Sequence, residues 1–107
     1  MSAVAVAGVT ALAAIGLAAG SALADCDGEA AALVKAETEL PVLDLTPPLH
    51  HELVCITLET LVNFGKRLGA HVARCPASPH ADKAATWERL RKDYLAKFRQ
   101  RRCRRHL

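Results

Sequence analysis

Apolar positions in the middle of the chain recur at alternating spacings of four and three, as they do along one face of an α-helix. These positions are Val54, Leu58, Leu61, Gly65, Leu68, Val72 and Cys75. The spacing predicts one long helix from about Pro48 to Arg74, with Thr46 as its N-cap and prolines in its first turn. Pro76 then marks the end of this helix.

Two further helices are predicted on either side of the long one. The first runs from about Asp27 to Leu40, where acidic residues favour a helix N-terminus and Pro41 ends the segment. The last begins at Ser78-Pro79, a cap followed by a first-turn proline. Its apolar side carries Ala84, Trp87, Leu90, Tyr94 and Phe98. No segment alternates with a period of two, so we expect an all-α fold: a small three-helix bundle, or a helical hairpin plus an N-terminal helix.

The first 24 residues carry no charged side chain and consist mainly of Ala, Val, Gly and Leu. They end in Ala22-Leu23-Ala24, a pattern typical of an export signal cleaved after Ala24, although no basic residue precedes the apolar run. The alternative is an uncleaved membrane anchor, because about 20 residues suffice to cross a bilayer. We expect residues 1–24 to be a signal peptide and residues 25–107 to form one domain, either periplasmic or secreted.

Charge is distributed unevenly along the predicted domain. Residues 25–59 carry eight acidic side chains and one basic one, whereas residues 60–107 carry thirteen basic and three acidic side chains. The net charges of the two parts are therefore −7 and +10, which the small total of +3 conceals.

Four cysteines in a short exported chain indicate two disulfides. Cys55 and Cys75 lie on one predicted helix, twenty residues or about 30 Å apart, whereas bridged Cα atoms lie within about 7 Å. Cys75 and Cys103 lie on either side of the last helix, at a still larger separation. Elimination of these pairs leaves Cys26–Cys75 and Cys55–Cys103. A zinc ribbon is disfavoured because the spacings contain no CxxC.

Helical periodicity supports the same pairing. At about 100° per residue, Cys55 and Cys75 point to opposite flanks of the apolar seam, so each flank faces a different neighbouring helix. A hairpin that closes near Ala77 brings Cys103 beside Cys55. The N-terminal helix can present Cys26 to Cys75 if the residues before Glu29 are extended.

The chain offers little that indicates catalysis. The five histidines are interpreted as solvated surface residues, with a metal site from His71 and His80 across the turn as the alternative; the others are His50, His51 and His106. All four cysteines are assigned to disulfides, and no serine lies in a nucleophile-elbow sequence. We therefore expect no enzyme, no metal and no cofactor.

Basic side chains are concentrated at the end of the chain. The candidate polyanion-binding residues are Lys97, Arg99, Arg101, Arg102, Arg104 and Arg105. Outside the cytoplasm, such a cluster favours anionic lipid, an anionic polysaccharide or an acidic protein as its partner. Single-stranded nucleic acid is disfavoured because few aromatic residues interleave the basic ones. The alternative is a solvated face that only keeps the chain soluble.

Two functional hypotheses follow. The first is a small exported helical binding protein, held rigid by two disulfides and directed at a protein or envelope partner. The second is a cationic protein that binds polyanions or membrane surfaces through its arginine-rich C-terminal helix. Dependence of binding on ionic strength separates them, because contacts made by the basic end weaken as salt increases.

Overall fold

The computed structural model describes residues 25–104, and this part of the chain is helical throughout its regular structure. A helix covers residues 25–38, α2 extends over His51–Arg74, and α3 extends over Ala84–Gln100, preceded by a 3-10 turn, η1, at Ala81–Lys83. No strand occurs between residues 25 and 104, so the all-α prediction is confirmed. None of the helices in this range is long and apolar enough to cross a membrane. The predicted signal peptide, Arg105 and His106 lie outside the described residues.

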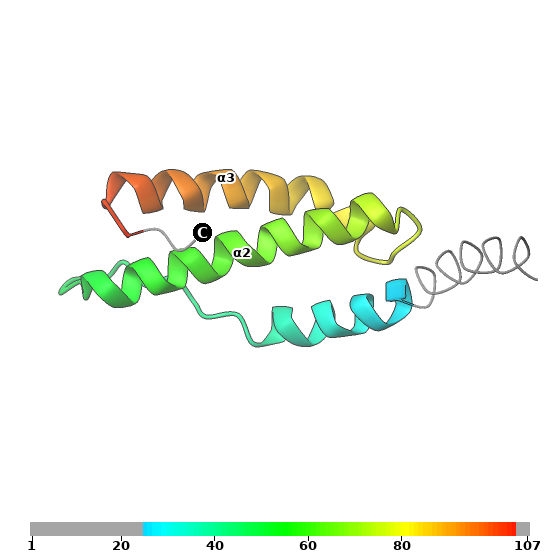
Figure 1. The fold of residues 1–107 in the computed structure, drawn as a ribbon. Coiled ribbons are helices and arrows are strands. Elements are labelled where there is room, and N and C mark those ends of the chain that lie inside the picture. The colour runs from blue at the N-terminus through cyan, green and yellow to red at the C-terminus, as the bar shows by residue number, and fades with distance from the viewer. Residues whose placement is uncertain (1–24, 105–107) are drawn as a thin grey trace, which may run out of the picture.

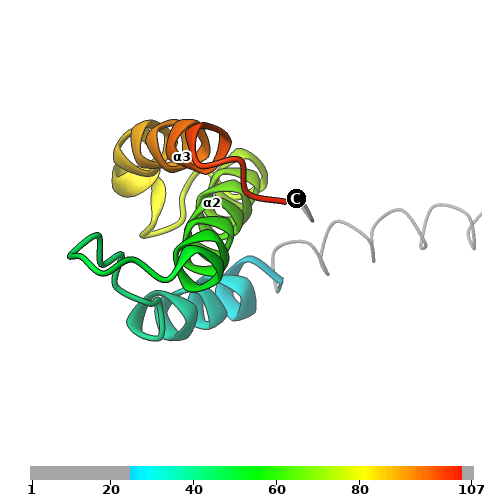
Figure 2. The same ribbon diagram turned by 90° about the vertical axis from the view of Figure 1, so that its left-hand side faces the viewer.

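The long helix α2 lies between the other two helices. Figure 1 shows α3 along one side of α2 and helix 25–38 along another, each running antiparallel to it. The end-on view in Figure 2 shows α2 between its two neighbours. Helix 25–38 also reaches η1, where Lys83 pairs with Glu37 at 2.9 Å. The predicted hairpin of α2 and α3 plus an N-terminal helix is therefore the observed architecture.

The N-terminal helix covers only part of α2. Its fourteen described residues span about 21 Å, against about 36 Å for the 24 residues of α2. The non-helical segment 39–50 spans the rest of α2 and returns the chain to the beginning of that helix. Residues 25–28 are helical, so the expectation of an extended segment before Glu29 was wrong. No extension is needed, because the helix lies beside the half of α2 that carries Cys75.

The core consists of two clusters along the seam of α2. Near helix 25–38, the buried side chains are Leu33, Leu61, Phe64, Leu68 and Trp87. Near the other end of the hairpin, they are Val54, Leu58, Phe98 and Cys103. The half-buried Leu43 and Tyr94 pack against both clusters and thereby join them. The apolar positions predicted from the sequence for α2 and α3 therefore face the interior.

Gly65 allows α2 and α3 to approach closely. A Cβ atom at this position would lie 2.9 Å from the Cβ of Arg91 and 3.5 Å from the carbonyl oxygen of Trp87. Gly69, one turn further along α2, is exposed and has no such neighbour within 4 Å. The glycine in the seam is thus a packing requirement of the hairpin.

Both predicted capping residues have other roles. α2 begins at His51, three residues after the predicted start, and no side chain caps it; the backbone N–H of Thr46 instead donates to Asp44 Oδ1 over 2.9 Å. This local turn competes with helix capping, as Asp side chains commonly do. α3 begins at Ala84 rather than at Ser78, because the intervening residues form a turn and η1.

Both predicted disulfides are present. The Cα atoms of Cys26 and Cys75 are 5.9 Å apart, and those of Cys55 and Cys103 are 5.5 Å apart. The two bridges close loops of nearly equal length, with sequence separations of 49 and 48 residues. On the chain-entropy model each one stabilises the fold by about 4 kcal/mol. The bridges therefore fasten the two outer helices to opposite ends of α2, in an oxidising compartment.

Candidate functional site

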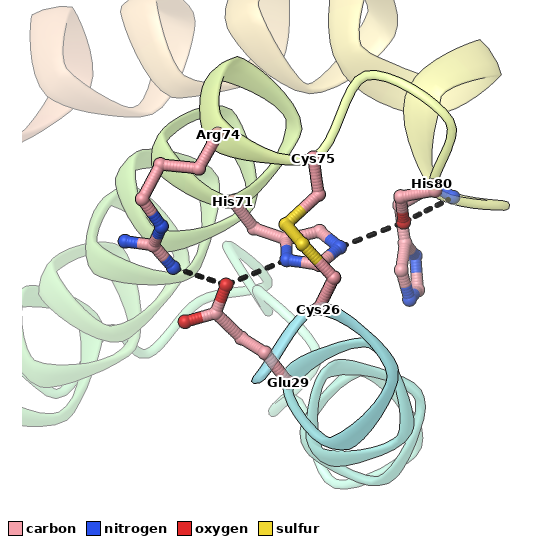
Figure 3. Close-up of a disulfide and its surroundings, with 7 residues drawn as sticks. Cys26, Glu29, His71, Arg74, Cys75 and His80 are labelled. Carbon is pink, nitrogen blue, oxygen red and sulfur yellow. Dashed lines mark hydrogen bonds and ion pairs between the residues drawn. A yellow bond between two sulfur atoms is a disulfide. The ribbon is translucent and has the colours of Figure 1, made fainter. Parts of the chain in front are cut away.

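A buried polar cluster surrounds the Cys26–Cys75 disulfide, where helix 25–38, the end of α2 and the following turn meet (Figure 3). Its centre is His71, whose side chain is fully buried. His71 Nδ1 lies 2.6 Å from Glu29 Oε1, and His71 Nε2 lies 2.7 Å from Ser78 Oγ. Arg74 donates to the same Glu29 oxygen. One chain of hydrogen bonds thus joins helix 25–38 to the end of α2, which is distant in the sequence, and to the turn that follows α2.

The partners of His71 and Ser78 order the hydrogen bonds of this cluster. Because the Glu29 carboxylate can only accept, His71 Nδ1–H donates to it, and His71 Nε2 forms the second bond of the ring with the Ser78 hydroxyl. Ser78 Oγ also accepts from the backbone N–H of His80. Hydrogen bonds from His71 and Arg74 hold the pKa of the Glu29 carboxyl below its usual range. The folded structure therefore favours the charged form of this carboxyl.

His80, from the turn after α2, lies beside His71 in the same cluster. Its side chain is buried, and Nε2–H donates to the backbone oxygen of Ala30 over 3.0 Å. Its Nδ1 has no hydrogen-bond partner among the described residues. The rings of His71 and His80 meet edge to face with centroids 5.7 Å apart. The interpretation of these two histidines as surface residues was therefore wrong, whereas His50 and His51 are exposed as expected.

Carboxylate, imidazole and hydroxyl follow one another here in the order found in serine hydrolases. Two features are typical of a structural role instead. The imidazole of His71 has no exposed surface. The two hydrogen bonds of His71 also bridge segments of the fold, one from α2 to Glu29 and the other from α2 to the turn at Ser78. We call Glu29, His71, Arg74 and Ser78 the polar latch, because their hydrogen bonds join segments of the fold beside the disulfide.

Two groups of side chains bring metal-ligating atoms within 4.8 Å of one another: Glu29 with His71 and Cys75, and His51 with Cys55 and Cys103. Each group includes cysteine sulfur that is committed to a disulfide. Metal ligation by cysteine requires the thiolate. With both bridges closed, each group retains one imidazole and at most one carboxylate.

The basic end of the chain is held in place by the second disulfide and by the end of α3. Cys103 N–H donates to the Phe98 oxygen and Arg102 N–H to the Arg99 oxygen. These two bonds define a Schellman motif, in which the residue after the helix adopts a left-handed conformation and is usually glycine. Here that residue is Arg102, with φ of 54°. This arginine therefore occupies a position where a side chain raises the conformational energy by about 1–2 kcal/mol.

The predicted polyanion-binding residues occupy different environments. Lys97 pairs with Asp93 at 2.8 Å, and Arg101 is half-buried. Arg99, Arg102 and Arg104 are exposed, and Arg105 lies outside the described residues. On the outer side of α3, Arg89 and Lys92 are exposed as well, which agrees with the orientation expected from Trp87, Leu90, Tyr94 and Phe98. The structure thus places most of the basic side chains on the surface.

A cavity of about 400 Å³ lies where the beginning of α2 meets the C-terminal turn. It is lined by His51, Glu52, Cys55, Ile56, Glu59, Arg102 and Arg104. Ile56 in its wall is exposed, and so are Leu49 and Leu53, which line a second cavity; these three side chains are called the apolar strip. This region was not predicted from the sequence, although the spacing of four and three residues between its apolar positions was a visible signal.

No protein family, curated protein or solved structure matches this chain.

Proposed function

We propose that the protein is a small non-catalytic binding module that works outside the cytoplasm and contacts an anionic surface of the cell envelope. The contact surface is the outer side of α3 together with the C-terminal turn. Disulfide Cys55–Cys103 holds the C-terminal turn of that surface against α2. Anionic lipid headgroups and acidic polysaccharides share the chemistry that this surface would recognise.

The observation that carries the proposal is the set of arginines without acidic partners. Residues 84–104 contain eight Lys and Arg side chains and two acidic ones, a net charge of +6. Within residues 25–104, five of these arginines form no ion pair: Arg89, Arg99, Arg101, Arg102 and Arg104. The acidic helix 25–38 does not neutralise them, because α2 lies between that helix and α3. Their charge remains available to an external anion.

The rigid attachment of this surface also supports the proposal. Disulfide Cys55–Cys103 and the Schellman motif fix the backbone immediately after α3. A side chain that projects from a fixed backbone loses less conformational freedom on binding than one on a free tail. A basic segment that served only solubility would need no such attachment.

The test is retention on anionic vesicles or heparin at low salt, with two variants of equal charge change. The first replaces Arg89, Lys92 and Arg99 with Gln on the outer side of α3. The control replaces Lys35, Lys66 and Arg67 with Gln, which are exposed on the other two helices. Basic residues near an anionic bilayer contribute about 1 kcal/mol each, so the first variant should bind about 100-fold more weakly.

The control variant should bind as the parent does, and binding of both should fall as ionic strength rises. Equal weakening of both variants would show that net charge alone is responsible, which would contradict a specific surface. A parent protein that is not retained at low salt would refute the proposed function.

A further inference from the structure

The cavity between the beginning of α2 and the C-terminal turn presents charges of both signs. Arg102 and Arg104 line one part of it, and Glu52 comes from the first turn of α2. Within residues 25–104, these three side chains form no ion pair with one another or with other residues. A second carboxylate, Glu59, also lines the cavity but already has an interaction of its own. The side chains left for a ligand are therefore two guanidinium groups and the Glu52 carboxylate.

This combination fits a ligand that is itself zwitterionic. Guanidinium groups are well suited to phosphate oxygens, because their N–H donors match the geometry of the anion. A simple phosphate would place its negative charge close to the Glu52 carboxylate, and repulsion between the two anions disfavours its binding. A ligand that carries a cation a few bonds from its phosphate satisfies both kinds of side chain at once.

The cation is better matched by a primary ammonium than by a quaternary one. Quaternary ammonium groups are recognised by cages of aromatic rings. None of the seven residues that line this cavity is Phe, Tyr or Trp. A primary ammonium, in contrast, donates hydrogen bonds to carboxylate oxygens such as those of Glu52.

The surroundings of the cavity favour a lipid as the source of this ligand. Ile56 lies in the cavity wall and is 60% exposed. Leu53, three residues before it on α2 and 61% exposed, lines a second cavity together with Leu49, and the three side chains make up the apolar strip. Exposed apolar strips of this kind mark contacts with membranes or proteins. Here the strip adjoins the charged cavity, as acyl chains adjoin a headgroup.

We infer that the cavity binds the headgroup of a phospholipid that carries a phosphate and a primary ammonium, as phosphatidylethanolamine does. Arg102 and Arg104 hold the phosphate, Glu52 holds the ammonium, and Ile56 and Leu53 contact the glycerol and the upper acyl chains. The inference deepens the proposed function and rests on it, because the arginines of α3 bring the protein to the envelope surface. The left-handed conformation of Arg102 directs this side chain from a fixed turn at the rim of the cavity.

The first test compares two sets of vesicles that contain the same minor fraction of phosphatidylglycerol. In one set the remaining lipid is phosphatidylcholine, and in the other half of it is replaced by phosphatidylethanolamine. We expect the oxidised full-length domain to bind the second set about fivefold more tightly, the effect of one additional ammonium–carboxylate contact. Glu52→Gln should abolish this gain, whereas the exposed control Glu39→Gln should retain it.

The second test uses a soluble headgroup, glycerophosphoethanolamine, with glycerophosphocholine as its comparison. Addition of the first compound should shift the NMR resonances of His51 and Ile56, which line the cavity, and the second should shift them much less. Arg102→Gln should suppress the shift, whereas Arg99→Gln, on the outer side of α3, should not. No shift with glycerophosphoethanolamine would overturn the inference.

The remaining outcomes separate the inference from the proposed function. A gain on phosphatidylethanolamine that survives Glu52→Gln would reflect membrane packing and would contradict a headgroup site. Resonance shifts without a gain on vesicles would point to a free phosphoester in place of lipid, and would also contradict it. Retention on phosphatidylglycerol with neither effect would leave the proposed function standing alone. Shifts without any retention would remove the proposed function and leave the cavity as a ligand site.

Discussion

Replacing Gly65 with alanine tests whether the close contact between α2 and α3 determines the packing of the hairpin. The backbone at Gly65 is ordinary right-handed helix, so an alanine is conformationally allowed there. The difficulty is spatial, because the new methyl group would lie 2.9 Å from Arg91 Cβ and 3.3 Å from Arg91 Cγ. The Cβ atom is fixed to the backbone of α3, so a change of rotamer cannot relieve the first contact.

The expected magnitude follows from a comparison with Gly69. In a helix interior alanine is more favourable than glycine by about 0.8–1.0 kcal/mol. At Gly69, where no atom lies within 4 Å of the new methyl group, Gly69→Ala should raise the free energy of unfolding by about that amount. At Gly65 the same gain is opposed by overpacking, which costs about 1–3 kcal/mol. The two variants should therefore differ by about 1–3 kcal/mol, with Gly65→Ala the less stable.

The assay is equilibrium unfolding in urea with both disulfides oxidised. Trp87 is the only tryptophan and packs against Phe64 with ring centroids 4.7 Å apart, so its fluorescence reports on the α2–α3 contact. Helical circular dichroism, recorded in parallel, should give the same midpoint if unfolding is two-state. If Gly65→Ala stabilises the protein as much as Gly69→Ala does, the close packing derived for the hairpin is incorrect.

Three further predictions concern the polar latch. Because the pKa of Glu29 is lowered in the folded protein, its stabilising effect is present above the ordinary value of 4.5 and is lost as the pH falls through the folded-state pKa. The free energy of unfolding, measured in urea at a series of pH values, should therefore fall less on acidification for Glu29→Gln than for the parent. The control Glu39→Gln should follow the parent. Equal pH profiles for Glu29→Gln and the parent would contradict the latch. Ser78→Ala leaves a buried nitrogen of His71 without its hydrogen bond and should lower the free energy of unfolding by about 1–3 kcal/mol. A fluorophosphonate probe should leave the parent protein unlabelled, and covalent labelling of Ser78 would instead establish a catalytic serine.

The sequence determined the helical fold and the disulfide pairing because both depend on rigid local geometry. The spacing of apolar residues fixed which side of α2 is buried, and the length of that helix excluded a bridge between Cys55 and Cys75. The sequence predicted the ends of the helices less accurately, because helix capping competes with local turns for the same polar groups. At Thr46 and Ser78, hydrogen bonds within the adjoining turns replaced the expected caps.

The latch and the cavity beside the C-terminal turn were decided by tertiary structure alone. Glu29 and His71 are 42 residues apart in the sequence, and their contact depends on the axial register of helix 25–38 against α2. Likewise Glu52 and Arg102 line one cavity only because disulfide Cys55–Cys103 returns the end of the chain to the beginning of α2. Periodicity specifies which face of a helix is buried, but not its position along a neighbour. That position is set by the combined packing of both core clusters, so the burial of His71 and His80 could not be predicted from the sequence.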